Sequence, residues 1–166
     1  MDDPDRQRFL DLLDNQKSAF DFDVVAYCLM PNHYHLLLET RFENLSSALK
    51  RLDQDYSQYF NRKYDRVGSL WQGRFKSWFV HDEKYLNVLI KYIERNPIKK
   101  GMTSRIGEYP WASSVTVTTA ATATENHALS FDEIAQLTEF FSTKFLPRAE
   151  LTLYSVWYNS VSNKVA

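Results

Sequence analysis

One stretch of the chain, residues 24–39, constrains the fold more than any other. Two runs rich in apolar and aromatic residues flank Met-Pro-Asn at residues 30–32, so the stretch predicts a β-hairpin. Successive side chains of a strand point to opposite faces, which places His33 and His35 on the same face. Two neighbouring imidazoles are either part of a metal site or a pair of hydrogen-bonded structural histidines. The hairpin pattern leaves both interpretations open.

The composition is that of a globular protein with a buried core. The chain has 166 residues, 44% hydrophobic and 25% charged, which fits one domain, at most with an appendage. Its single cysteine, Cys28, excludes an intrachain disulfide and favours a reducing compartment. The acidic residues 1–5 are followed by no apolar signal segment, and no run is long enough to span a bilayer. We therefore expect a cytoplasmic protein with no membrane partner.

Positive charge is concentrated in the middle third of the chain. Residues 50–105 hold 13 Lys and Arg against 6 Asp and Glu, a net charge of +7, whereas residues 1–49 carry −5 and residues 106–166 carry −3. Aromatic residues are interleaved with these cations. Cations attract phosphates and exposed rings stack on bases, so the combination indicates a surface for single-stranded nucleic acid. The alternative is a solvated helix face above an aromatic core; we favour nucleic acid because of the charge asymmetry.

Hydrophobic periodicity predicts three helices and one further strand around the hairpin. Asn44 is a plausible N-cap for the second helix, and Pro97 disfavours helix in the residue before it, which ends the third. The expected elements are helices at residues 5–20, 44–63 and 82–96 and a strand at residues 74–80.

The C-terminal part of the chain has a different character. Residues 112–126 are rich in Ala and Thr, which is consistent with a linker or an irregular excursion. A capping box then opens an expected helix at residues 130–143. Residues 151–158 fit either a strand or a helix.

Two polar residues on the third helix are placed for chemistry. Tyr92 and Asn96 are four apart, so they lie one above the other between the apolar stripe and the basic face of the helix. That position suits a nucleophile and a metal ligand, since it is held by the core and open to an anionic substrate. The alternative is a core-rim tyrosine and an ordinary helix C-terminal asparagine.

Four stretches of the sequence occur together in a known family. The chain resembles the single-tyrosine transposases of the HUH endonuclease superfamily, in particular the branch associated with repetitive extragenic palindromes. The matching stretches keep the family's order and approximate spacing. They are residues 26–37, 68–76, 92–97 and 109–114.

The resemblance implies an α+β fold. We expect a ferredoxin-like antiparallel sheet with helices on one face, formed by residues 1–114 as the nuclease domain. Residues 115–166 would form the linker and a C-terminal helical extension.

The resemblance also implies a site and a reaction. His33, His35 and Asn96 would bind Mg²⁺ or Mn²⁺, and Tyr92 would attack single-stranded DNA next to a hairpin, leaving a covalent 5′-phosphotyrosine. This chemistry is that of a DNA-nicking enzyme and strand transferase. The expected DNA contacts are Arg66, Arg74, Lys76, Lys91 and Arg95.

One departure from the family bears on activity. The family fold begins with a β-strand that lies next to the histidine strand, whereas this chain begins with a helix. Loss of that strand would leave an inner sheet edge unpaired. Three explanations are open: a start further upstream, a decayed copy, or replacement by residues 151–158. The replacement could occur within a monomer or by strand exchange in a homodimer.

Two other functions remain open. The chain could be a non-catalytic protein that binds DNA hairpins and derives from such a transposase. It could also be a metal-binding protein without a nucleic-acid role, using His33, His35 and His81.

Overall fold

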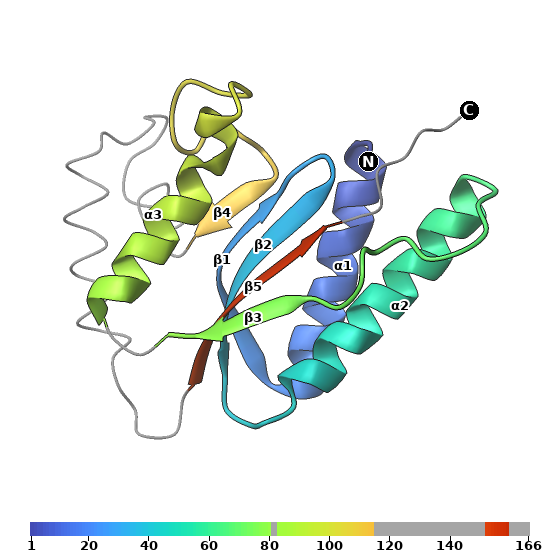
Figure 1. The fold of residues 1–166 in the computed structure, drawn as a ribbon, viewed down its shortest axis with the longest axis horizontal. Coiled ribbons are helices and arrows are strands. Elements are labelled where there is room, and N and C mark those ends of the chain that lie inside the picture. Colours follow the sequence, from blue (N-terminus) through green and yellow to red (C-terminus); the bar gives the residue numbers. More distant parts are fainter. Residues whose placement is uncertain (81–82, 115–151, 160–166) are drawn as a thin grey trace.

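The computed structural model describes residues 1–80, 83–114 and 152–159 (Figure 1). In the part of the chain that is described, no helix is both long and apolar enough to cross a membrane. The elements in chain order are α1 (Asp3–Phe20), β1 (Phe22–Leu29), β2 (His33–Thr40), α2 (Leu45–Lys63), β3 (Lys76–Phe79), α3 (Glu83–Lys99), β4 (Ala112–Ser114) and β5 (Thr152–Asn159).

The hairpin is the centre of a five-stranded sheet with the order β3-β5-β2-β1-β4, in which all neighbouring strands are antiparallel. Strands β1 and β2 pair from Phe22 opposite Thr40 to Leu29 opposite Tyr34, with one irregularity between Val24 and Ala26. The predicted hairpin and the α+β class with an antiparallel sheet are therefore confirmed.

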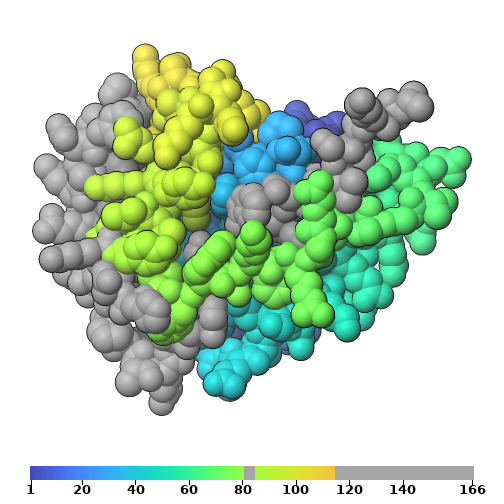
Figure 2. All heavy atoms as spheres, in the orientation of Figure 1, coloured from blue at the N-terminus to red at the C-terminus, as the bar shows by residue number. Residues whose placement is uncertain are grey.

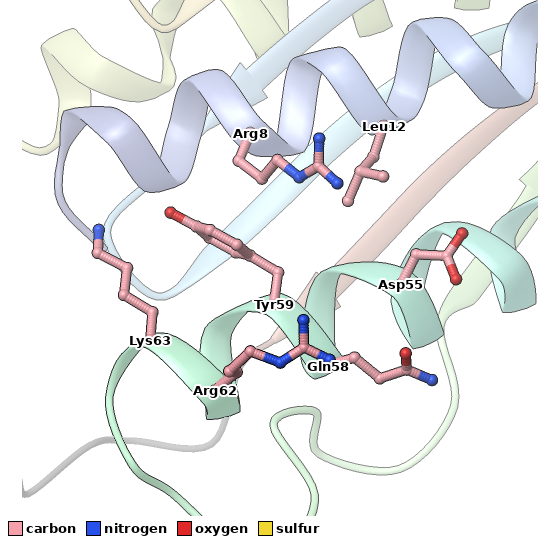
Figure 3. A pocket seen from close by; sticks show the side chains of 7 residues that line it. All are labelled: Arg8, Leu12, Asp55, Gln58, Tyr59, Arg62 and Lys63. Carbon is pink, nitrogen blue, oxygen red and sulfur yellow. The ribbon is translucent and has the colours of Figure 1, made fainter.

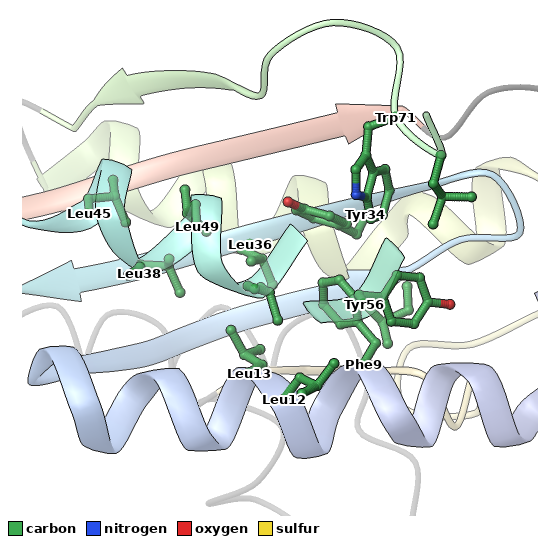
Figure 4. Packing of buried hydrophobic residues seen from close by; sticks show 14 of the residues in the cluster. Phe9, Leu12, Leu13, Tyr34, Leu36, Leu38, Leu45, Leu49, Tyr56 and Trp71 are labelled. Carbon is green, nitrogen blue, oxygen red and sulfur yellow. The ribbon is translucent and has the colours of Figure 1, made fainter. Parts of the chain in front are cut away.

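Helices α1 and α2 cover one face of the sheet. Their apolar side chains enclose alternate residues of β2 in a core that contains Phe9, Tyr34, Leu36 and Tyr56, all buried (Figure 4). At the start of α1, Asp2 and Asp5 form a reciprocal capping box that satisfies backbone N–H groups of the first turn.

Helix α3 covers the opposite face. Its buried residues Leu86, Ile90 and Ile93 pack with Cys28 of β1 and Leu37 of β2. The expectation that helices lie on one face alone therefore differs from the structure. A hairpin covered on both faces explains why apolar residues run without alternation along β2.

Strand β5 occupies the position between β2 and β3. Residues 152–159 pair beside the histidine strand within the same chain, in the way that the replacement explanation expects, while the upstream start and the decayed copy stay predictions. The domain boundary at residue 114 stays a prediction. The helix expected at residues 130–143, and His81, lie outside the described residues.

The end of α3 corrects one prediction. The helix continues through Pro97 to Lys99 instead of ending at Asn96. A proline removes only its own N–H from the helix, and the turn after it is held by other backbone bonds, including Lys100 N–H to Asn96 O at 3.1 Å. Asn96 therefore lies within the last turn of the helix.

Candidate active site

The two histidines lie on the face of the sheet that α3 covers. Their rings are perpendicular, with centroids 5.0 Å apart. His33 is half-buried at the start of β2, and His35 is buried. Tyr34 between them points to the opposite face, into the core under α1 and α2. The strand thus directs the two histidines to one face of the sheet and the buried Tyr34 to the other.

Helix α3 brings Tyr92 to the histidines. The rings of Tyr92 and His35 are perpendicular, with centroids 5.4 Å apart, and Tyr92 keeps 42% of its surface exposed. Asn96, one turn further on, is buried, and its side-chain N–H donates to Tyr92 O at 2.8 Å. This bond orients the amide and leaves its oxygen as the group that can bind a cation.

Hydrogen bonds and burial define the protonation of the histidines. Asn32 Oδ1 lies 2.8 Å from His33 Nδ1, which suits a neutral ring that donates from Nδ1 and keeps Nε2 as a ligand. Burial, with a smaller effect of nearby Lys100, lowers the pKa of His33. Burial, and then His33, lowers the pKa of His35 to about 3. Both rings are therefore neutral at pH 7, the form that binds metal.

A buried nitrogen indicates that a cation fits this site. His35 Nε2 is buried and has no hydrogen-bond partner among the described residues. A neutral imidazole nitrogen with no donor opposite it is a suitable metal ligand. Within residues 1–80, 83–114 and 152–159, no group of three or more His, Cys, Asp or Glu could hold a metal ion. The Asn96 amide, held at the backbone of Tyr92, is a candidate for a further ligand beside the two histidines.

Lysines at the end of α3 add positive charge. The ammonium of Lys99 lies 4.8 Å from the centroid of the Tyr92 ring. Lys99 is not among the site residues predicted from the sequence, although its spacing of seven from Tyr92 places both on one side of the helix. Lys91 and the exposed Arg95 lie on the same helix.

The other predicted DNA contacts divide between the two faces. Arg74 and Lys76 are exposed on the segment that enters and forms β3. Arg66 instead stacks on Phe60, its guanidinium carbon 5.8 Å from the ring centroid, next to the core under α2. The structure therefore places Arg66 away from the histidine face, and its role in binding DNA stays a prediction.

The stretches that resemble the family also contain residues whose hydrogen bonds help to hold the hairpin in place. The Tyr34 hydroxyl donates to the buried Asp53 carboxyl at 3.0 Å, and the Trp71 indole N–H donates to Asp53 O at 3.2 Å. The Tyr109 hydroxyl donates to Leu29 O at 2.8 Å, at the end of the strand that precedes the histidine turn.

Helix α3 is tied to β4 near the site. The Ser114 hydroxyl donates to Glu94, which is buried two residues after Tyr92. This contact, together with the apolar stripe of α3, holds Tyr92 over the sheet.

A separate cavity of about 380 Å³ lies between α1 and α2 (Figure 3). Its lining includes the ring of Tyr59 and three cations, Arg8, Arg62 and Lys63. Lys63 forms ion pairs with Asp2 and Asp5, at 2.9 Å and 2.7 Å, which neutralise part of this charge. The cavity is on the helical layer opposite α3, so it is not part of the histidine site.

A comparison with protein families identifies the chain. The family model described as "Transposase IS200 like" matches residues 1–96. The chain belongs to this family. By this membership the chain is a transposase-like protein.

Two curated relatives agree with membership among the IS200-like transposases. A protein of Haemophilus influenzae, named provisionally as a REP-associated tyrosine transposase, is 29% identical over 105 residues, covering 57% of this chain and 60% of the relative. The REP-associated tyrosine transposase of Escherichia coli is 22% identical over 94 residues, covering 55% of this chain and 54% of the relative. The chain thus spans little more than half the length of these relatives. No solved structure matches it significantly.

Proposed function

We propose that this IS200-like transposase cuts and rejoins single-stranded DNA next to a hairpin, with Tyr92 as nucleophile. The observation that carries the proposal is the contact between Tyr92 and His35, whose ring centroids are 5.4 Å apart. Beside it, the buried His35 Nε2 has no hydrogen-bond partner among the described residues. A nucleophile next to potential metal ligands on a cationic helix is the arrangement that phosphodiester cleavage requires.

The reaction would proceed by exchange of one bond at phosphorus. The Tyr92 oxygen loses its proton to solvent and attacks the scissile phosphorus, forming an O–P bond. The bond from phosphorus to the 3′ oxygen breaks, and that oxygen takes up a proton as a free 3′ hydroxyl. A 5′-phosphotyrosine remains, and attack by the 3′ hydroxyl of another strand reverses the step and transfers the strand.

His33, His35 and the Asn96 amide would together bind Mg²⁺ or Mn²⁺. When bound, the cation supplies positive charge against the reacting phosphate. The protein supplies the rest: the Asn96 bond to the Tyr92 backbone orients the amide, and Lys99 adds charge beside the Tyr92 ring at 4.8 Å. Because single-stranded DNA is the expected substrate, we propose that the protein acts in the cytoplasm.

Formation of a covalent adduct tests the proposal. An oligonucleotide with a hairpin flanked by single strands is labelled at its 3′ end and incubated with the protein and Mn²⁺. A 5′-phosphotyrosine retains the 3′ label on the protein in a denaturing gel. We expect the adduct with the unchanged chain and with Tyr85→Phe, and none with Tyr92→Phe. Tyr85 is the matched control because its side chain is also 42% exposed on α3.

Two outcomes would contradict the proposal. Adduct formation by Tyr92→Phe would show that another residue is the nucleophile. Tight hairpin binding without any adduct, unchanged by Tyr92→Phe and by chelators, would identify a non-catalytic DNA-binding protein.

A further inference from the structure

Strand β5 lies between β2 and β3, in a position that we call the β5 slot. It pairs with β2 along its full length and, at its other edge, with all of β3. Among the strands described, β3 pairs with β5 alone. The attachment of β3 to the sheet therefore depends on the strand that fills this slot.

The register relates β3 to the histidines. His35 and Lys76 both pair with residue 157, from opposite edges of β5. Directly opposed residues of antiparallel strands share a face, so Lys76 lies on the face of His35, about 10 Å away at the usual strand spacing. Trp78 is two residues further along β3, on the same face, with 52% of its surface exposed.

Helix α3 and strand β3 border the same face of the molecule. Atoms of both reach the surface in Figure 2, with α3 in yellow-green and the β3 segment in green. Tyr92 and Lys99 come from the helix, and Lys76 and Trp78 come from the strand. A nucleic-acid strand that approaches Tyr92 across β3 would meet a cation for its phosphate and a ring for its base.

We propose that residues 152–159 of this chain complete the DNA site by filling the β5 slot, which carries Lys76 and the base-stacking residue Trp78 to the histidine face. The role of Lys76 and Trp78 in binding DNA rests on the proposed function, whereas the pairing of residues 152–159 in the β5 slot does not. Trp78 lies outside the stretches that resemble the family, so its role comes from the register and exposure in this structure.

Disulfide trapping tests the occupant of the slot. Ser77 and Val156 pair directly, and opposed residues in antiparallel strands have the Cα separation that a disulfide requires. We expect Ser77→Cys with Val156→Cys to form an intramolecular disulfide under mild oxidation. The matched control, Ser77→Cys with Leu153→Cys, is out of register. Equal yields for the two pairs, or a disulfide that links two chains, would overturn the proposal that this chain fills its own slot.

DNA binding tests the coupling of β5 to the site. Hairpin DNA is titrated without divalent cations, so that no cleavage intervenes. We expect Trp78→Ala to weaken binding about tenfold, since a stacked base is lost. Phe42→Ala is the control, because Phe42 is a 60% exposed ring outside this site, and it should leave binding unchanged.

A proline in β5 completes the test. Ser155→Pro removes a backbone donor from the ladder, so Trp78→Ala should have no further effect in that variant. A synthetic peptide of residues 152–159 should restore binding by filling the slot, which separates loss of the strand from general unfolding. A full effect of Trp78→Ala in the Ser155→Pro chain, or no restoration by the peptide, would contradict the proposal. Failure of adduct formation alone would contradict only the proposed function.

Discussion

The ring of Tyr92 meets the ring of His35 edge-on, with their centroids 5.4 Å apart. The contact joins a helix on one side of the sheet to the central strand. It predicts that the two residues have separable roles in one reaction, the histidine in binding the cation and the tyrosine in attacking the phosphate.

Replacing His35 should therefore remove cation binding. We expect His35→Ala to weaken Mn²⁺ binding by at least about tenfold, because a buried ligand nitrogen is lost. Electron paramagnetic resonance of free Mn²⁺ measures the affinity. Tyr92→Phe serves as the control, since it keeps every proposed ligand. Equal Mn²⁺ affinity in His35→Ala and the unchanged chain would show that the histidine is structural.

Lys99 should contribute to the rate of DNA cleavage. Its ammonium lies 4.8 Å from the centroid of the Tyr92 ring, where the phosphate would approach in the proposed reaction. We expect Lys99→Ala to slow adduct formation by about tenfold and to reduce the salt dependence of DNA binding by about one phosphate contact. Lys50→Ala, an exposed change on α2, is the matched control. A rate unchanged by Lys99→Ala would exclude this role.

The buried Asp53 should make stability depend on pH. Burial raises the pKa of its carboxyl to about 8, although the Tyr34 hydrogen bond opposes this. The folded protein therefore holds a proton that the unfolded chain releases at about pH 4. Between about pH 4 and pH 8, the free energy of unfolding should fall as pH rises, by up to about 1.4 kcal/mol per pH unit from this group.

Urea denaturation at pH 5 to 8 measures this dependence. In Asp53→Asn the side chain cannot titrate, so the difference in unfolding free energy between variant and unchanged chain should shift in favour of the variant as pH rises. Parallel pH profiles for the two proteins would show that Asp53 is already ionised in the folded state.

Loss of the Tyr109 hydroxyl should loosen the histidine turn. Tyr109→Phe leaves the buried Leu29 carbonyl without this donor, which we expect to cost about 1–2 kcal/mol of unfolding free energy. Hydrogen exchange of Met30 N–H, which bonds to His33 O, should also accelerate. Tyr85→Phe, a change at a tyrosine that is 42% exposed on α3, provides the comparison. Unchanged exchange at Met30 would show that the turn is held by other contacts.

Local patterns predicted much of the fold. The hairpin, α1 and α2 follow from turn residues and periodicity, which act within a few residues. The expected N-cap Asn44 is at the start of α2, but its side chain donates to Phe20 O instead of capping the helix. This hydrogen bond depends on the position of α1 beside α2, so the sequence around Asn44 could not predict it.

The candidate site was likewise predictable only in part, because local spacing does not determine contacts between elements. The spacing of His33 and His35, and that of Tyr92 and Asn96, places each pair on one face of its own element. The contact between the two pairs depends on how α3 crosses the sheet. The placement of Arg66 beside Phe60, and of Lys99 beside Tyr92, likewise arises from packing.

The sheet pairs Thr40 with Thr152, which lies 112 residues further along the chain. A ribosome therefore makes both helical layers before it makes the strand that belongs in the middle of the sheet. Pairing over such a separation is slow, and an open strand edge accepts strands from other chains. Between synthesis of β2 and synthesis of β5, the edge of β2 is therefore open to pairing with strands of other chains.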